Sequence, residues 1–434
     1  MRSIPLALAI LLAVSAHAQQ PEGPLISPLQ SPVPGVSPGE LPSPGTLSSE
    51  ARVTVLTMLP GREVYAHYGH SAVRVVDPAT GLDRTYNYGT FDFDQPHFIL
   101  RFIRGQLDYE LSVAPYDRLI AEYQFRGRTV IEQHLDLPPA VNRRVFQLLE
   151  ENYRPEHRAY RYSFFFDNCS TRILDILEQA SGTPLVPRVQ TTAQADSFRD
   201  LIDPYIAGDP LVRFGIFLGL GSPTDREATM RERAFLPVEL MLALDRARVQ
   251  QQPLVAVTDT VVWFEEDNVH GIPNRAFDWP AIIFWLLLVA IGGLTAVNVF
   301  ADRAAFRRGL RVFDIVLLVV AGLFGLLLLF LWFGTEHGVT GNNLNVFWLL
   351  PTHLIAAIVY ARRPQGRGII AYGLITAGLT VVFALVTPFL PQSFAPAAYP
   401  AMLLLALRLA AGLGGLERQR ILTGDAESKR RMTD

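Results

Sequence analysis

Residues 162–172 read Tyr-Ser-Phe-Phe-Phe-Asp-Asn-Cys-Ser-Thr-Arg, and this stretch decides the fold around it. Its aromatic half predicts a short strand over residues 160–166, and the polar residues that follow predict a turn. Asp167 or Asn168 can cap a helix that begins at Cys169. Apolar residues then recur at helical spacing until a glycine at position 182 ends the pattern: Ile173, Leu174, Ile176, Leu177 and Ala180.

Cys169 is the one cysteine of the chain, which excludes an internal disulfide and any site that needs several cysteines. A thiol at a helix N-terminus meets the positive end of the helix dipole, and this favours the thiolate. A lone cysteine is more often buried and inert. Because polar residues flank this one on both sides, we predict that Cys169 is a nucleophile.

A thiolate nucleophile needs a base, and the best candidate is His70, in the stretch His-Tyr-Gly-His-Ser-Ala at residues 67–72. Gly69 lets the backbone approach closely, and the strand expected over residues 71–76 fixes the ring. His67 is the rival base. The other histidines of this half of the chain lack such a setting: His97, His134 and His157.

A third group should orient the imidazole. Turn residues at 77–81 return the chain as a strand over residues 84–88, which brings Asn87 near His70. Asn87 is therefore the predicted orienting residue, and Asp92 is the alternative. Asn168 and Arg172 flank the cysteine and are predicted to bind substrate. Asn168 is also a candidate oxyanion donor, although backbone N–H groups at the helix start would serve as well.

Further elements complete one mixed domain over residues 49–275. Strands are expected at 53–58 and 129–135, and helices at 140–153 and 237–250. The predicted base precedes the predicted nucleophile along the chain, which is the reverse of the order in papain. Circularly permuted papain-like folds, such as NlpC-like and lecithin:retinol acyltransferase-like proteins, show this reversed order. We therefore expect an α+β, permuted papain-like domain, an expectation that rests on analogy between folds.

The region before this domain has the features of an export signal and a linker. Residues 1–18 have a positive start at Arg2, an apolar stretch over 4–14 and an Ala-His-Ala cleavage site at 16–18, as signal peptides do. An uncleaved N-terminal anchor is the alternative. Residues 19–48 are rich in Pro, Ser and Gly, which predicts a disordered linker.

Composition separates this chain from an ordinary soluble enzyme. Of its 434 residues, 50% are hydrophobic and only 18% are charged, whereas charged residues make up about a quarter of an average soluble protein. The formal net charge of −3 gives no reason to expect a nucleic-acid partner. No metal ion and no organic cofactor is predicted.

The second half of the chain is apolar and predicts about five transmembrane helices. Arginines follow the first, third and fifth of these helices, and the loops after the second and fourth contain no Lys or Arg. The positive-inside rule then places the exported domain outside the membrane and residues 416–434 in a cytoplasmic tail. The predicted spans lie within a transmembrane domain at 279–415, near 279–299, 313–333, 346–361, 368–390 and 397–413.

Four stretches of the exported domain together resemble the Lnb family of bacterial lipoprotein N-acyltransferases: residues 69–75, 86–93, 104–109 and 165–172. The most specific are Asn-Tyr-Gly-Thr-Phe-Asp-Phe at 87–93 and Asp-Asn-Cys-Ser-Thr-Arg at 167–172, and the resemblance continues into the apolar half. It implies that His70 is the base and Cys169 the nucleophile, while His67 lies outside the motif. It also implies the reaction, in which an acyl chain moves from a phospholipid to the α-amino group of a lipoprotein's N-terminal cysteine.

The resemblance further implies an acid–His pair and an Asn-x-Asn motif in the loop between the second and third spans. Here these are Glu336-His337 and Asn343-Leu-Asn345, and all four polar side chains are predicted to bind substrate. The family carries Asp more often than Glu before the histidine, so the role of Glu336 stays open. A solvated connector is the alternative for this loop. His353, inside the third span, is expected to face a protein interior or a cavity.

Together these features predict a membrane-anchored cysteine acyltransferase of the bacterial inner membrane, with its catalytic domain in the periplasm. Its partners would be a phospholipid donor, a lipoprotein acceptor and the membrane itself. Two alternatives stay open. One is a papain-like amidase or peptidase that acts on cell wall, and the other is a membrane sensor or binding module with a degenerate papain-like domain.

Overall fold

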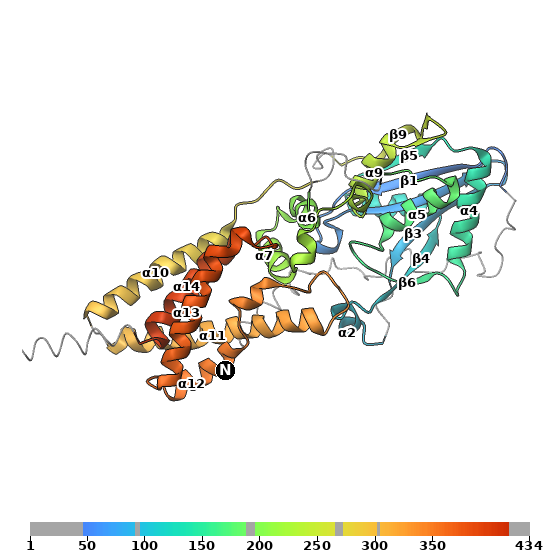
Figure 1. The fold of residues 1–434 in the computed structure, drawn as a ribbon. Coiled ribbons are helices and arrows are strands. Elements are labelled where there is room, and N and C mark those ends of the chain that lie inside the picture. The colour runs from blue at the N-terminus through green and yellow to red at the C-terminus, as the bar shows by residue number, and fades with distance from the viewer. Residues whose placement is uncertain (1–46, 92–95, 188–195, 265–271, 302–303, 416–434) are drawn as a thin grey trace, which may run out of the picture. The chain divides into compact units, whose positions relative to one another are not determined.

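The computed structural model describes residues 47–91, 96–187, 196–264, 272–301 and 304–415 (Figure 1). The predicted signal peptide, almost all of the predicted linker, Asp92 and the predicted cytoplasmic tail lie outside these residues. The chain divides into two compact units. The first, called here the sheet unit, comprises residues 1–206 and 227–274, and the second, the helical unit, comprises residues 207–226 and 275–434.

The sheet unit is built on a seven-stranded antiparallel sheet with the order β6-β4-β3-β2-β1-β5-β9. Successive side chains of the long strands point to opposite faces of the sheet. Apolar side chains form a buried core on each face. The strands are β1 (Arg52–Met58), β2 (His70–Asp77), β3 (Leu82–Thr90), β4 (Asp108–Ala114), β5 (Val130–Leu135), β6 (Ala159–Arg161) and β9 (Val255–Val262), and a separate hairpin pairs β7 (Arg248–Val249) with β8 (Gln252–Pro253).

Helices cover both faces of this sheet. Helices α4 and α5 pack together over one face, above the larger apolar core (Figure 1). Helix α3 belongs to the smaller core on the other face. The helices of the sheet unit are α2 (Phe98–Ile103), α3 (Tyr116–Phe125), α4 (Pro139–Tyr153), α5 (Cys169–Ser181), α6 (Phe198–Ile206), α8 (Met230–Arg233) and α9 (Pro237–Arg246), with a 3₁₀ turn η2 (Val64–Ala66).

The predicted elements of this unit are confirmed, with two differences in extent. The predicted strand at 160–166 stops at Arg161, because Ser163 and Asp167 form an isolated bridge that closes a tight turn before α5. The predicted helix at 237–250 ends at Arg246, because the β7–β8 hairpin begins two residues later. An α+β domain with an antiparallel sheet is thus confirmed.

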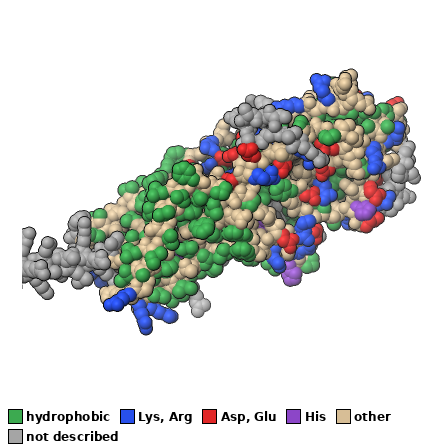
Figure 2. Space-filling model, in the orientation of Figure 1, with side chains coloured by type: hydrophobic (Ala, Val, Ile, Leu, Met, Phe, Trp, Pro, Cys, Tyr) green, Lys and Arg blue, Asp and Glu red, His purple; other side chains and the backbone are tan. Residues whose placement is uncertain are grey.

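The helical unit is built mainly from apolar helices of different lengths. Figure 2 shows hydrophobic side chains over much of its visible face, as expected for helices that contact lipid. Its elements are α7 (Pro210–Gly219), η3 (Ser222–Asp225), α10 (Trp279–Ala301), α11 (Ala304–Phe333), η4 (Leu344–Phe347), α12 (Thr352–Arg362), α13 (Arg367–Val386), η5 (Thr387–Phe389), α14 (Ala398–Arg408) and a π-helical turn η6 (Leu409–Leu413).

Four segments of the described chain are long and apolar enough to cross a membrane: Trp279–Val299, Phe306–Phe333, Leu344–Arg362 and Arg367–Phe389. The fifth predicted span, 397–413, forms a shorter apolar helix over Ala398–Leu413, so the length criterion gives four spans rather than five. A buried ion pair between Arg408 and Asp314 ties α14 to α11, and Arg408 also donates to Thr295 of α10. This pairing explains how a charged side chain is accommodated in the apolar bundle.

One segment departs from the domain boundaries expected from the sequence. Residues 207–226 lie within the range expected for the exported domain, but they belong to the helical unit. Their helix α7 contacts α10, where the Phe214 and Phe284 rings meet at a centroid distance of 6.0 Å. An apolar helix of ten residues has no sequence feature that assigns it to one unit or the other.

Candidate active site

Cys169 is the first residue of α5, and Asn168 caps this helix. The Asn168 side chain accepts hydrogen bonds from the backbone N–H groups of Ser170 (2.9 Å) and Thr171 (3.0 Å), and the Thr171 hydroxyl accepts one from the Asn168 N–H. The Asn168 amide also donates to the carbonyls of Phe164 and Phe235. Asn168 is therefore a buried capping residue whose polar atoms are all engaged, which leaves none of them for the predicted contact with substrate.

His70, the first residue of β2, meets the thiol. The imidazole is hydrogen-bonded to Cys169, and its Nε2 is hydrogen-bonded to Oδ1 of Asn87 on β3. The Asn87 contact leaves Nδ1 as the ring nitrogen available to the sulfur. Thus the structure brings the predicted nucleophile, base and orienting residue together, as a thiol nucleophile with a general base requires.

Burial and the interaction between His70 and Cys169 shift the pKa values of these two groups in opposite directions. Burial by itself would lower the pKa of His70, but the negative sulfur of Cys169 and the hydrogen bonds to Cys169 and Asn87 raise it above its ordinary value. Burial would likewise raise the pKa of Cys169, but the charge and hydrogen bond of His70 and the Ser71 N–H lower it. Both shifts favour a thiolate beside an imidazolium, which is the reactive form of such a site.

The residues that follow the two catalytic candidates hold the two elements in register. Ser71 and Ser170 are fully buried, and their hydroxyl oxygens lie 3.0 Å apart in a hydrogen bond between β2 and α5. Before His70, Gly69 has φ +77°, and a Cβ there would lie 2.8 Å from the Met58 carbonyl oxygen. Ser71 and Ser170 were not predicted as site residues, because their position next to the catalytic candidates is the one signal for them in the sequence.

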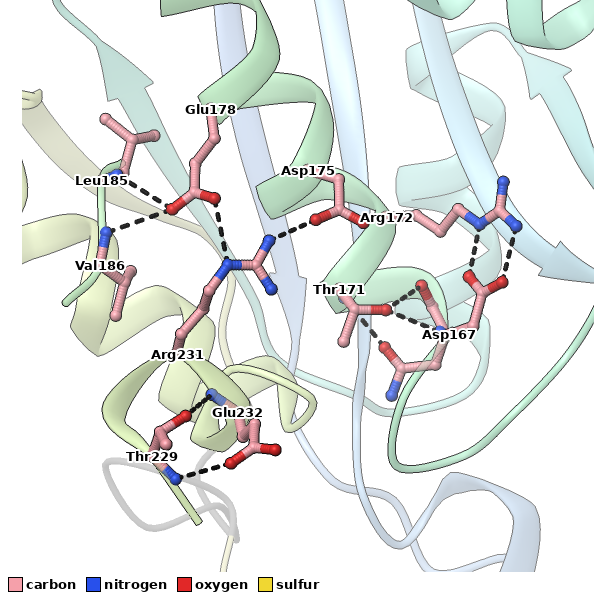
Figure 3. A network of polar contacts seen from close by, with 11 residues as sticks. Asp167, Thr171, Arg172, Asp175, Glu178, Leu185, Val186, Thr229, Arg231 and Glu232 are labelled. Atoms are coloured by element: carbon pink, nitrogen blue, oxygen red, sulfur yellow. Dashed lines mark hydrogen bonds and ion pairs between the residues drawn. The ribbon is translucent and has the colours of Figure 1, made fainter. Parts of the chain in front are cut away.

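Arg172 forms an ion pair rather than an open binding group. Its guanidinium binds Asp167 through two hydrogen bonds of 2.5 and 2.7 Å (Figure 3), and its Cζ lies 4.0 Å above the Tyr160 ring centroid. Farther along α5, Arg231 joins Asp175 and Glu178 to α8 (Figure 3). Arg172 is therefore engaged by Asp167 and by the Tyr160 ring.

The rival histidines lie outside the constellation. His67 is buried, and its Nε2 contacts the Arg62 carbonyl at 3.2 Å, so its ring is bound to the loop that precedes β2. His134 lies on β5 and pairs with Asp259, and His157 pairs with Glu151. His97 is an exposed residue next to α2 with φ 58°. This geometry favours His70 over His67 as the base.

The Asn-x-Asn motif of the helical unit is buried in backbone contacts. The Asn343 amide donates to the carbonyls of Leu218 (2.8 Å) and Gly219 (3.1 Å), and its oxygen accepts from Asn345 and Gln392. Asn345 contacts Leu218 and accepts a hydrogen bond from Trp348. Both asparagines fasten the loop to the end of α7 and have no amide group left for substrate.

The acid–His pair of the same loop has a different setting. Glu336 and His337 are exposed, with the backbone of Val339 folded back on the His337 carbonyl. His353 is fully buried, as predicted for a residue inside the third span. Its two ring nitrogens contact the Trp348 carbonyl and the Tyr372 hydroxyl.

Each of the two units matches a model of a known protein family. Residues 45–203 match the family model described as the Lnb N-terminal periplasmic domain, and residues 273–417 match the model described as the Lnb transmembrane domain. The first match contains His70, Asn87 and Cys169. No curated protein and no solved structure matches the chain.

Proposed function

This chain belongs to the Lnb family, and on that basis we propose that it is a cysteine acyltransferase. Family membership and the four apolar spans make it a membrane protein with a periplasmic domain. The proposed reaction moves an acyl chain from a phospholipid to the α-amino group of a lipoprotein's N-terminal cysteine. The observation that carries the proposal is the Cys169–His70–Asn87 constellation at a capped helix start.

The proposed chemistry has two halves. In the first, the Cys169 thiolate attacks the ester carbonyl carbon, the C–O bond to the lysophospholipid breaks, and the leaving alkoxide takes a proton from His70. In the second, the acceptor amine attacks the thioester, the C–S bond breaks, and the proton that the amine loses goes to His70. The amide product forms and the thiolate–imidazolium pair is restored, with no metal or organic cofactor required.

Each residue of the constellation has a distinct part in this proposal. The helix start and the imidazolium stabilise the thiolate, and Asn87 holds the ring through Nε2 so that Nδ1 faces the sulfur. The order of His on a strand and Cys at a helix start supports a permuted papain-like arrangement for the sheet unit. An intact, charge-stabilised pair favours an enzyme over a degenerate binding module.

The helical unit supports a lipid substrate over a cell-wall substrate. A hydrolase acting on cell wall has no need for four apolar spans, whereas a phospholipid donor lies in the bilayer that such spans cross. The absence of Lys and Arg from the loop at residues 334–345 favours placing it on the periplasmic side of the inner membrane. Glu336 and His337, being exposed, are retained as candidate substrate-binding residues.

The test is complementation of a bacterial strain that lacks lipoprotein N-acylation, with the mass of the lipoprotein's N-terminal lipopeptide as the readout. We expect the wild-type chain to add the mass of one acyl group to the α-amine, and the Cys169→Ser variant to add none. Unmodified lipopeptide with well-expressed wild-type chain, together with release of cell-wall fragments by the purified protein, would favour the amidase alternative.

A further inference from the structure

A tyrosine beside the dyad has a buried hydroxyl that the fold does not use. Tyr160 is 7% exposed, and its hydroxyl has no hydrogen-bond partner among the residues that the structure describes. A buried polar group without a partner is destabilising, so such groups in native structures call for an explanation, which can be a catalytic role.

The ring that carries this hydroxyl is held from two sides. The Arg172 guanidinium, itself fixed by Asp167, lies 4.0 Å above the ring centroid. The Tyr88 ring meets it edge-on at a centroid distance of 6.1 Å. Contacts of this kind fix the position of an aromatic ring. The Tyr160 hydroxyl is therefore positioned before any substrate binds.

The hydroxyl and the imidazole of His70 both lie close to Gly89. Gly89 has φ +94° at a bulge in β3, and the position that its Cβ would take lies 4.0 Å from the Tyr160 hydroxyl oxygen and 3.9 Å from Cε1 of His70. The Tyr162 ring is 3.8 Å from the same point. Because residue 89 is a glycine, no Cβ stands between the Tyr160 hydroxyl and the His70 ring.

The hydroxyl also keeps its proton in this setting. Burial and the negative charge of Cys169 raise the pKa of Tyr160 well above its ordinary value. Tyr160 therefore remains a hydrogen-bond donor at pH values at which an ordinary tyrosine begins to ionise, and it is close enough to Cys169 to experience the charge of the sulfur.

We propose that the Tyr160 hydroxyl donates a hydrogen bond to the acyl oxygen that becomes negative when Cys169 attacks a carbonyl. The S–C bond forms, the C=O π pair moves to oxygen, and Tyr160 stabilises that oxyanion without giving up its proton. This inference rests on the proposed acyl transfer. It deepens that proposal by identifying a side-chain donor for the acyl oxygen.

The experiment compares Tyr160→Phe with wild type in the full chain, purified in detergent micelles. The probe is a p-nitrophenyl ester of a fatty acid, and the readout is the rate at which Cys169 becomes acylated, followed by nitrophenolate release and intact mass. We expect acylation to slow by about 10²–10³-fold, the effect of removing one oxyanion donor. Alkylation of Cys169 by iodoacetamide, which forms no oxyanion, should stay within about twofold of wild type.

The matched control is Tyr88→Phe, which removes a hydroxyl from the same aromatic cluster. The Tyr88 hydroxyl binds Asn152 at 2.8 Å, so we expect this variant to lose thermal stability and to be acylated at the wild-type rate. Wild-type acylation of Tyr160→Phe would overturn the inference, and so would an equal loss of acylation and alkylation. If wild type reacts with the nitrophenyl ester but not with phospholipid, the proposed function fails while the role of Tyr160 is still tested.

Discussion

The dyad of the sheet unit and the loop over residues 334–348 of the helical unit use buried polar groups in opposite ways. In the dyad, Asn87 binds an imidazole that in turn binds the Cys169 thiol, which is the proposed nucleophile. In the loop, Asn343 and Asn345 are equally buried, but their amides bind backbone carbonyls, one another and Gln392.

The difference shows what distinguishes a reactive polar cluster from a structural one. His70 and Asn87 in the dyad, like the two asparagines of the loop, have hydrogen-bond partners. In the dyad the pKa of His70 is raised and that of Cys169 is lowered, so both shifts favour a charged pair. In the proposed mechanism an asparagine beside a histidine serves the reaction, while two asparagines beside backbone carbonyls serve the fold.

Replacing the nucleophile should have the largest effect. Cys169→Ser is nearly isosteric and keeps the capped helix, but a serine hydroxyl does not ionise at a helix start as a thiol does. We expect acyl transfer to fall by about 10⁴-fold or more with an unchanged melting temperature, measured by lipopeptide mass and thermal unfolding. Activity within tenfold of wild type would remove Cys169 from the mechanism.

Replacing the base should have the next largest effect. His70→Ala is expected to reduce acyl transfer by about 10²–10⁴-fold, whereas His67→Ala, whose ring contacts a loop carbonyl, should stay within a few-fold of wild type.

The pH dependence of iodoacetamide alkylation reports the same interaction. A lowered Cys169 pKa means that alkylation persists below the ordinary thiol range and declines as pH falls through that lowered value. In His70→Ala the inflection should move to higher pH. An inactive His67→Ala variant would reverse the assignment of the base.

The asparagine of the loop should affect stability rather than chemistry. Asn343→Ala leaves the carbonyls of Leu218 and Gly219 without the Asn343 amide, and we expect the free energy of unfolding to drop by about 1–3 kcal/mol. Iodoacetamide should still alkylate Cys169 at the wild-type rate. Thermal unfolding in detergent micelles measures the first effect, and an unchanged melting temperature would contradict it.

His337→Ala is the matched variant in the same loop, because its side chain is exposed. If this loop binds substrate, as proposed, acyl transfer should fall by up to about 10²-fold, because the substrate is mispositioned. The melting temperature of the protein should not change. A fully active His337→Ala variant would mean that the loop has a structural role and does not bind substrate.

The local part of the site could be predicted from the sequence. A glycine before His70, a five-residue turn that returns Asn87, and a cap before Cys169 are each encoded within a few neighbouring residues. The dyad itself followed from two such local signals. Hydrophobic periodicity likewise predicted the main strands and the long apolar helices.

The parts that depend on packing between distant segments could not be predicted. Tyr160 reaches the dyad because β6 pairs with β4 and because Arg172 lies over its ring, and neither contact leaves a pattern in the sequence. Residues 207–226 join the helical unit through contacts with α10 and the 334–348 loop. The polar side chain of Asn343 indicated a hydrogen-bonding role. Its sequence context could not show whether the partner is a backbone carbonyl or a substrate.

The smallest effect expected in this comparison concerns the Ser71–Ser170 hydrogen bond, a structural contact that lies inside the reactive cluster. Ser170→Ala removes this bond of 3.0 Å and also the hydroxyl that helps lower the pKa of Cys169. A neutral hydrogen bond contributes about 1 kcal/mol, so acylation should slow about fivefold and the alkylation inflection should move slightly to higher pH. Ser170→Thr keeps the hydroxyl and should restore the pH profile.

If the two hydroxyls act as one unit, adding Ser71→Ala to Ser170→Ala should cost little more than Ser170→Ala alone, since residues in contact are not additive. Additive losses would mean that each serine acts separately. A wild-type pH profile in Ser170→Ala would show that the cap and His70 alone set the thiolate. The Ser71–Ser170 hydrogen bond between β2 and α5 would then have a structural role, as the asparagines of the loop do.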